Sequence, residues 1–312
     1  MELSILIYIA AGIASLAVLA KASDNLLDAL SDYAHKIGAS DYLAGFFILA
    51  IGTALPELAA SLSGARLGES AVVLGTILGS NFFKIPLLGV GFVLGKKMKV
   101  NLESLGNAPV TTFLACALPI ILVIDGELTR VDGVIMLFVY AYYVALLWSG
   151  EGELGKLKKD VPIKKLWKDM FTFWICLVFV LLASIVLVVS ARQVAEEVHM
   201  SLFLVSFVII GIGSSAPEIS VLIQTVRKKK QAFTFGNILG SMVANSLFAL
   251  GIVTVISPFS IDPMTILPTG IAYLVSLLVT FWIIEREYVD WRHGLVLIGM
   301  FVLFVGVETY LG

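Results

Sequence analysis

Two segments of the chain that lie 161 residues apart carry nearly the same sequence. Gly52–Glu57 reads GTALPE, and Gly213–Glu218 reads GSSAPE. Each is followed at the same interval by a second shared block, which reads GTILGS at Gly75–Ser80 and GNILGS at Gly236–Ser241. Because all four blocks lie inside long apolar runs, each repeat places one glutamate at membrane depth. An ionisable side chain there is costly and is by default a functional group. The duplication therefore predicts a pair of related carboxylates that serve one cation site.

The composition is that of a polytopic membrane protein. Hydrophobic residues make up 59% of the 312 residues and charged residues only 14%, with a mean hydropathy of +0.99. A spanning helix needs about 20 mostly apolar residues, and no barrel-type alternation is present, so helices are the spanning elements. The apolar run that starts at Leu3 is interpreted as a first helix and not as a cleaved signal. The sequence predicts an all-α membrane protein with ten transmembrane helices, at 3–32, 42–65, 71–95, 109–124, 129–149, 167–191, 201–226, 232–256, 265–284 and 289–311.

A charged linker divides five predicted helices from five. We expect a first repeat at 1–150, a cytoplasmic linker at 151–168 and a second repeat at 169–312, with the duplicated motifs inside 40–91 and 201–252. Because five is odd, the second half enters the membrane from the opposite side, as in many secondary transporters. With both termini outside, the inner loops hold sixteen Lys and Arg residues and the outer loops three. This asymmetry favours a multi-pass plasma-membrane protein with N- and C-termini outside.

The repeated blocks carry oxygen ligands. Thr53 and Glu57 are four residues apart, as are Ser214 and Glu218, so each hydroxyl shares a helix face with its carboxylate. A proline inside a helix also frees the carbonyl of the preceding turn, and one proline precedes each glutamate. Such hard oxygen donors suit Ca²⁺ or Na⁺. We expect the second, third, seventh and eighth helices to surround one site, with the glycines of the second blocks allowing close approach.

On these motifs the chain resembles the calcium/cation antiporters, in particular the prokaryotic sodium/calcium exchangers, over nearly its whole length. The resemblance implies that Glu57 and Glu218 are bidentate Ca²⁺ ligands. It implies further oxygen from Thr53 and Ser214 for Ca²⁺ and Na⁺, from the backbone of Ala50 and Gly211, and from Ser80, Ser215 and Ser241 for Na⁺, with Asn245 at a position that is acidic or amide in the family.

Two residues depart from the family pattern. Ala54 stands where the family usually has serine, and Lys84 stands where it usually has asparagine, the counterpart of Asn245. An ammonium can stand in for a bound monovalent cation, but it also repels Ca²⁺. Either Lys84 loses its proton when Ca²⁺ binds, or the site prefers to bind and transport a different cation. Alternatively, Lys84 snorkels away from the site or forms a fixed bridge to one glutamate.

These features predict a secondary active antiporter that exchanges Ca²⁺ for Na⁺ by alternating access around Glu57 and Glu218. H⁺ as the coupling ion, or an altered cation load caused by Lys84, is the alternative. An intramembrane hydrolase with paired carboxylates explains neither the hydroxyl neighbours nor the duplication, and a channel would need a continuous polar stripe. We expect no enzymatic activity, no cofactor and no nucleic-acid partner, but a monomeric transport unit in contact with membrane lipid.

Overall fold

The protein is an all-helical membrane protein. The computed structural model describes residues 2–36, 54–95, 97–99, 108–149, 163–215, 218–219, 222, 238–286 and 288–311. The helical elements of the first half are α1 (Glu2–Lys36), α4 (Leu55–Arg66), α5 (Ser70–Gly95), α7 (Ala108–Leu122) with η2 (Val123–Asp125), and α8 (Arg130–Ser149). Those of the second half are α9 (Ile163–Val198), the succession α10 (Leu202–Val205), η3 (Ser206–Ile210) and α11 (Gly211–Ser214), a helix at Ile238–Ile256 that contains η4 (Ala244–Ala249) and α14 (Leu250–Ile256), α15 (Pro263–Ile284) and α16 (Trp291–Leu311).

Burial separates the central helices from the peripheral ones. Six helices of the described residues are long and apolar enough to cross a membrane. Two of these are mostly buried, Ser70–Leu94 at 78% and Ile238–Ile256 at 83%, whereas Trp291–Glu308 is only 17% buried. The poorly buried helices expose large apolar side chains, as expected of surfaces in contact with lipid. The block Gly75–Ser80 and the described part of its counterpart, Ile238–Ser241, therefore belong to the two most buried of these helices.

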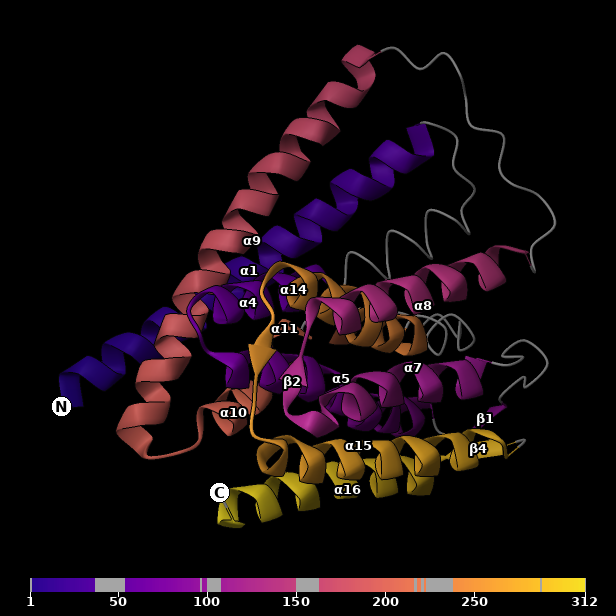
Figure 1. Cartoon of the computed structure of the whole chain (residues 1–312). Helices are drawn as coiled ribbons and strands as arrows, with labels where there is room; N and C mark the ends of the chain where they lie inside the picture. The colour runs from indigo at the N-terminus through magenta and orange to yellow at the C-terminus, as the bar shows by residue number, and fades with distance from the viewer. Residues whose placement is uncertain are drawn as a thin grey trace.

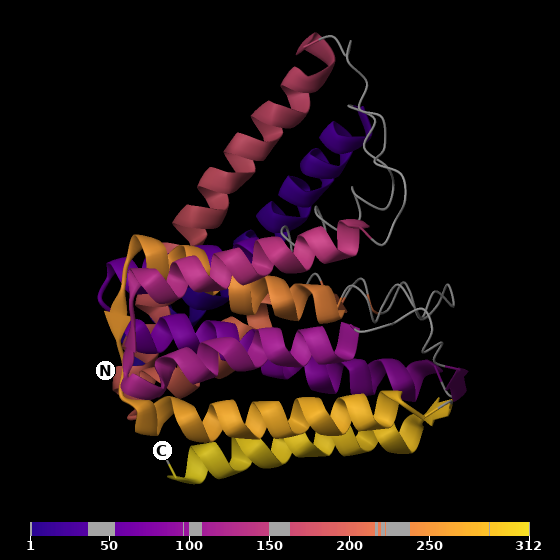
Figure 2. The same cartoon turned by 45° about the vertical axis from the view of Figure 1, so that its right-hand side comes forward.

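Helices α1 and α9 form a pair that is set at an angle to the others. In both views they run side by side across the bundle, and their Lys36 and Ile163 ends project beyond it (Figure 1, Figure 2). The contact between them is made by small and branched side chains, including Leu19, Leu187 and Val188, all fully or almost fully buried. The same apolar cluster extends to α4, so this pair is joined to the helix that carries Glu57.

Glycine lets the two halves of the chain meet at backbone distance. A methyl group placed on Gly75 would lie 2.7 Å from the carbonyl oxygen of Phe203, and one on Gly211 would lie 2.7 Å from the carbonyl carbon of Gly79. One on Gly79 would fall on the backbone of Phe207. The close approach expected for Gly75 and Gly79 is therefore confirmed, and it brings α5 against η3 and α11. Gly236 lies outside the described residues.

Aromatic packing fills the space beside this contact. The ring of Phe82 on α5 packs edge-on against Phe207 of η3, with centroids 5.9 Å apart, and against Phe301 of α16, with centroids 5.5 Å apart. Tyr273 of α15 lies 5.8 Å from the same ring. One fully buried phenylalanine thus connects helices from both halves.

The structure extends and corrects the predicted elements. Ten helical segments are confirmed in the parts of the chain that the structure describes, but α9 runs from Ile163 to Val198 instead of 167–191, so the end of the predicted linker and the exposed Arg192 are helical. Two short antiparallel pairs were not predicted: β1 (Lys97–Lys99) with β4 (Tyr288–Asp290), and β2 (Glu127–Leu128) with β3 (Phe259–Ser260). They lie at opposite ends of the bundle and tie loops of the two halves together (Figure 1).

Substitution of Gly79 by alanine tests the backbone contact. The methyl group of alanine would collide with backbone atoms of Phe207, which cannot move aside as the end of a flexible side chain can. We therefore expect Gly79→Ala to lower the free energy of unfolding by about 1–3 kcal/mol, the usual range for overpacking. Thermal unfolding of the protein in detergent measures this. Gly299→Ala on α16, where an added methyl meets nothing within 4 Å, is the matched control. Equal unfolding temperatures for the two variants would contradict the proposed contact.

Candidate cation site

The two glutamates lie in equivalent turns of the two repeats. The N–H of Leu58 donates to the carbonyl of Ala54 at 2.9 Å, and the N–H of Ile219 donates to the carbonyl of Ser215 at 3.2 Å. These two bonds are related by the same 161-residue offset as the sequence blocks. Each closes one helical turn that contains a glutamate. The duplication seen in the sequence is therefore also present in the backbone structure around the two glutamates.

The proline of the first block lies in the first turn of a described helix; the part of the predicted helix at 42–53 lies outside the described residues. Helix α4 begins at Leu55, so Pro56 occupies its first turn, where a missing N–H costs nothing. Glu57 lies in the same turn, where the positive end of the helix dipole favours a carboxylate. In the second half α11 ends at Ser214, and Pro217 lies outside the described residues. Within the described residues, Glu57 therefore lies in the first turn of α4.

Hydroxyl groups from both halves bind Glu57. Its Oε1 accepts from the hydroxyl of Ser80 on α5 at 2.7 Å and from that of Ser214 on α11 at 3.0 Å. The Ser215 hydroxyl lies 3.2 Å from that of Ser80. The Glu57 side chain is 0% exposed, and its Oε2 has no hydrogen-bond partner in the described part of the chain. One oxygen of this carboxylate is therefore held in place, and the other is available.

Among the described residues, Lys84 is the polar partner that faces Glu218. Its Nζ lies 3.7 Å from Oε1 of Glu218, and both side chains are 0% exposed. This distance is an ion-pair contact but exceeds a normal hydrogen bond. Neither Glu218 oxygen nor the Lys84 nitrogen has a hydrogen-bond partner among the described residues. The ammonium also interacts electrostatically with Glu57, and the two carboxylates interact with each other. Of the alternatives that the sequence left open for Lys84, snorkelling out of the site is ruled out by this burial.

An amide network connects the site with the centre of the bundle. The amide nitrogen of Asn245, in the π-helical turn η4, donates to the Ser80 hydroxyl at 3.3 Å and to Oδ1 of Asn81 at 3.2 Å. Asn81 in turn donates to the Ser246 hydroxyl at 2.8 Å and to the Met242 carbonyl at 3.3 Å. This arrangement uses the Asn245 nitrogen twice and leaves its Oδ1 without a partner among the described residues. Amide oxygens are among the ligands that hard cations take, so the Asn245 oxygen could bind a cation near Glu57.

The structure unites most, but not all, of the predicted site residues. Its hydrogen bonds and ion pair connect Glu57, Ser80, Ser214, Ser215 and Asn245 in one network and place Lys84 against Glu218. The hydroxyl of Ser241 instead donates to the Ile238 carbonyl of its own helix. The carbonyl of Gly211 is present but accepts from both Ser214 and Ser215. Thr53 and Ala50 lie outside the described residues.

Asn81 and Ser246 were not predicted from the sequence as residues of this network. Both are buried and polar, and Asn81 directly follows Ser80 in the repeated block. The signal was an asparagine in an otherwise apolar span, where an unpaired amide is costly. It has no polar counterpart in the second repeat, where Met242 occupies the equivalent position, so a search for duplicated residues passes over it. Instead, its amide reaches the backbone of that equivalent residue.

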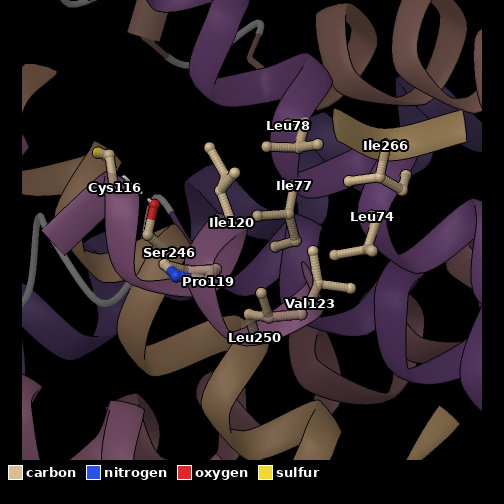
Figure 3. Close-up of a pocket in the computed structure, with 10 residues that line it drawn as sticks. All are labelled: Leu74, Ile77, Leu78, Cys116, Pro119, Ile120, Val123, Ser246, Leu250 and Ile266. Atoms are coloured by element: carbon tan, nitrogen blue, oxygen red, sulfur yellow. Dashed lines mark hydrogen bonds between the residues drawn. The ribbon is translucent and has the colours of Figure 1, made fainter. Parts of the chain in front are cut away.

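A small pocket lies at the far end of this network. Figure 3 shows it between α5, α7, η4 and α15, with Ser246 and Cys116 together at one edge and apolar side chains elsewhere. The Ser246 hydroxyl donates to the sulfur of Cys116 at 3.7 Å. No carboxylate lines the pocket. The pocket is therefore distinct from the candidate cation site, although a chain of hydrogen bonds joins the two.

The chemistry of the site favours a hard cation. Within the described ranges no group of three or more His, Cys, Asp or Glu side chains comes together. The oxygen donors are the carboxylates of Glu57 on α4 and of Glu218 beyond the end of α11, the hydroxyls of Ser80 on α5 and Ser214 on α11, and the amide of Asn245 in η4. Ca²⁺ and Na⁺ take such ligands, whereas zinc and copper prefer nitrogen or sulfur.

Comparison with known proteins agrees with this geometry. The family model described as sodium/calcium exchanger protein matches the chain twice, at residues 7–149 and 168–310. Inner membrane protein YrbG of Escherichia coli (strain K12) is 27% identical over 96% of this chain and 96% of its own length. Among solved structures, the sodium-calcium exchanger NCX_Mj superposes with a TM-score of 0.67 at 18% identity, covering 97% of this chain and 99% of its own. The H⁺/Ca²⁺ exchanger CAX superposes with a TM-score of 0.77 at 15% identity, covering 97% and 86%. The chain therefore belongs to the sodium/calcium exchanger family of cation antiporters.

Proposed function

We propose that this protein exchanges Ca²⁺ for a monovalent cation across the plasma membrane, with Glu57 and Glu218 as the central ligands and both termini outside. The observation that supports this most strongly is the placement of two fully buried carboxylates, one from each repeat, in turns related by the same sequence offset. Oxygens of both remain without hydrogen bonds among the described residues. Buried carboxylate oxygens without partners are costly, and a bound cation would remove that cost.

The remaining donors fit the same role. Ser80 and Ser214 approach Glu57 from different halves, so a cation bound there would be shared between the repeats. Asn245 offers its amide oxygen, and Ser215 a hydroxyl beside that of Ser80. We propose Thr53, Ser241 and the backbone of Ala50 and Gly211 as further ligands. Ser241 and Gly211 would have to exchange their present hydrogen bonds for the ion.

The coupling ion in this proposal is Na⁺, with H⁺ as the alternative. The structural relatives include a sodium-calcium exchanger and an H⁺/Ca²⁺ exchanger, and both share the fold with this chain. At these identities they support the fold alone. Neutral hydroxyl and amide donors around Glu57 favour Na⁺, since they supply the oxygens that a bare monovalent ion needs. Uptake of ⁴⁵Ca²⁺ into proteoliposomes under an imposed Na⁺ or pH gradient distinguishes the two.

Neutralising either glutamate tests the site. We expect Glu57→Gln and Glu218→Gln each to reduce gradient-driven ⁴⁵Ca²⁺ uptake at least about a hundredfold, since losing a charged ligand in a site screened from water costs several kcal/mol. The amide keeps the size of the side chain and, in Glu57→Gln, an acceptor for Ser80. Glu308→Gln on α16, a half-buried carboxylate elsewhere in the bundle, is the control. Wild-type rates in both site variants, or uptake indifferent to both gradients, would refute the proposal.

Asn81 is proposed as a positioning residue for Asn245. In Asn81→Ala, the Asn245 amide loses the acceptor that fixes its orientation, so we expect the half-saturating Ca²⁺ concentration to rise about fivefold to tenfold, the worth of one hydrogen bond, with little change in maximal rate. Initial rates over a range of Ca²⁺ concentrations measure both quantities. The control is Ser246→Ala, which removes one Asn81 acceptor but leaves its contact with Asn245. An unchanged half-saturating concentration in Asn81→Ala would contradict the role.

A further inference from the structure

The two halves of the site neutralise their carboxylates differently. By the 161-residue offset, Lys84 is the counterpart of Asn245, and Ser80 that of Ser241. In one half Asn245 reaches Ser80, and Ser80 binds Glu57. In the other half the hydroxyl of Ser241 donates to a carbonyl of its own helix, and Nζ of Lys84 lies 3.7 Å from Oε1 of Glu218. Within the described residues, hydroxyl dipoles therefore stabilise Glu57, and a full positive charge stabilises Glu218.

The surroundings of Lys84 make the carboxylates its principal neutralising partners. The side chain is 0% exposed and belongs to one of the most buried helices of the bundle. Its nitrogen makes no hydrogen bond within the described part of the chain. A buried ammonium is tolerated only when an opposite charge is close, and in the described part of the chain the carboxylates that act on it are Glu218 and Glu57. The ammonium thus occupies a position that a mobile cation would otherwise fill.

We propose that the Lys84 ammonium acts as a tethered monovalent cation, which lowers by one the number of monovalent ions exchanged for each Ca²⁺. Two carboxylates and one ammonium leave the site with a net charge of −1, so a single monovalent ion completes it. With an uncharged residue at this position the net charge is −2, and two are required. The inference rests on the proposed antiport function and specifies its coupling ratio.

Lys84→Gln and Lys84→Met remove the charge with little change in side-chain length, and Lys84→Arg retains it. In proteoliposomes held at zero membrane potential with equal K⁺ and valinomycin, the equilibrium ratio of ⁴⁵Ca²⁺ across the membrane follows the ratio of the driving ion, Na⁺ or H⁺, raised to the coupling number. The slope of the logarithmic plot therefore counts monovalent ions per Ca²⁺. We expect the Gln and Met variants to exceed the wild-type slope by one and the Arg variant to match it. Equal slopes in wild type, Lys84→Gln and Lys84→Met would overturn the inference.

A binding measurement separates this inference from the antiport proposal. If no gradient moves Ca²⁺ in the wild type, the proposed function fails, but ⁴⁵Ca²⁺ binding to the purified protein in detergent still tests the tethered charge. Removing an ammonium from a site screened from water should tighten Ca²⁺ binding at least about tenfold in Lys84→Gln and Lys84→Met, and not in Lys84→Arg. Binding that is no tighter in either uncharged variant than in wild type would exclude a charge-compensating role for Lys84.

Discussion

Two carboxylates with no solvent exposure at the centre of a membrane protein must be compensated, and the structure around them is organised by that requirement. Hydroxyls of Ser80 and Ser214 and the start of α4 stabilise Glu57. Glu218 is stabilised by Lys84. Neither arrangement satisfies all the carboxylate oxygens within the described residues. The incomplete compensation is the reason for proposing a cation site at this position and not only a buried ion pair.

The backbone makes this arrangement possible. Close contact between Gly79 and η3 brings the two halves together, so side chains as short as serine can reach a glutamate of the other half. The π-helical turn η4 carries Asn245 and Ser246, and such turns inside helices often accompany functional sites. Helix α4 begins at Leu55 and places Glu57 in its first turn, and the binding sites of many transporters likewise use helix ends.

Much of this could be predicted from the sequence because it depends on patterns that repeat. Hydropathy predicts the helix number, and the duplication singles out Glu57 and Glu218 as well as the asymmetry of Lys84 against Asn245. What could not be predicted depends on contacts across the chain. The hydrogen bonds of Asn81 depend on the crossing of α5 with the helix that bears Met242. The hydroxyl of Ser241 donates to a carbonyl of its own helix, and the residue type alone does not predict this bond. The start of α4 depends on the turn around Ala54, which a continuous apolar run conceals.

The most direct test of a cation between the two repeats is a crystal structure of the protein soaked with Sr²⁺, a heavy substitute for Ca²⁺ whose anomalous scattering locates it without ambiguity. We expect one strong peak within bonding distance of carboxylate oxygens of both Glu57 and Glu218, with the Lys84 ammonium displaced from its contact with Glu218. A peak bound elsewhere in the protein, or one that contacts neither carboxylate, would contradict it.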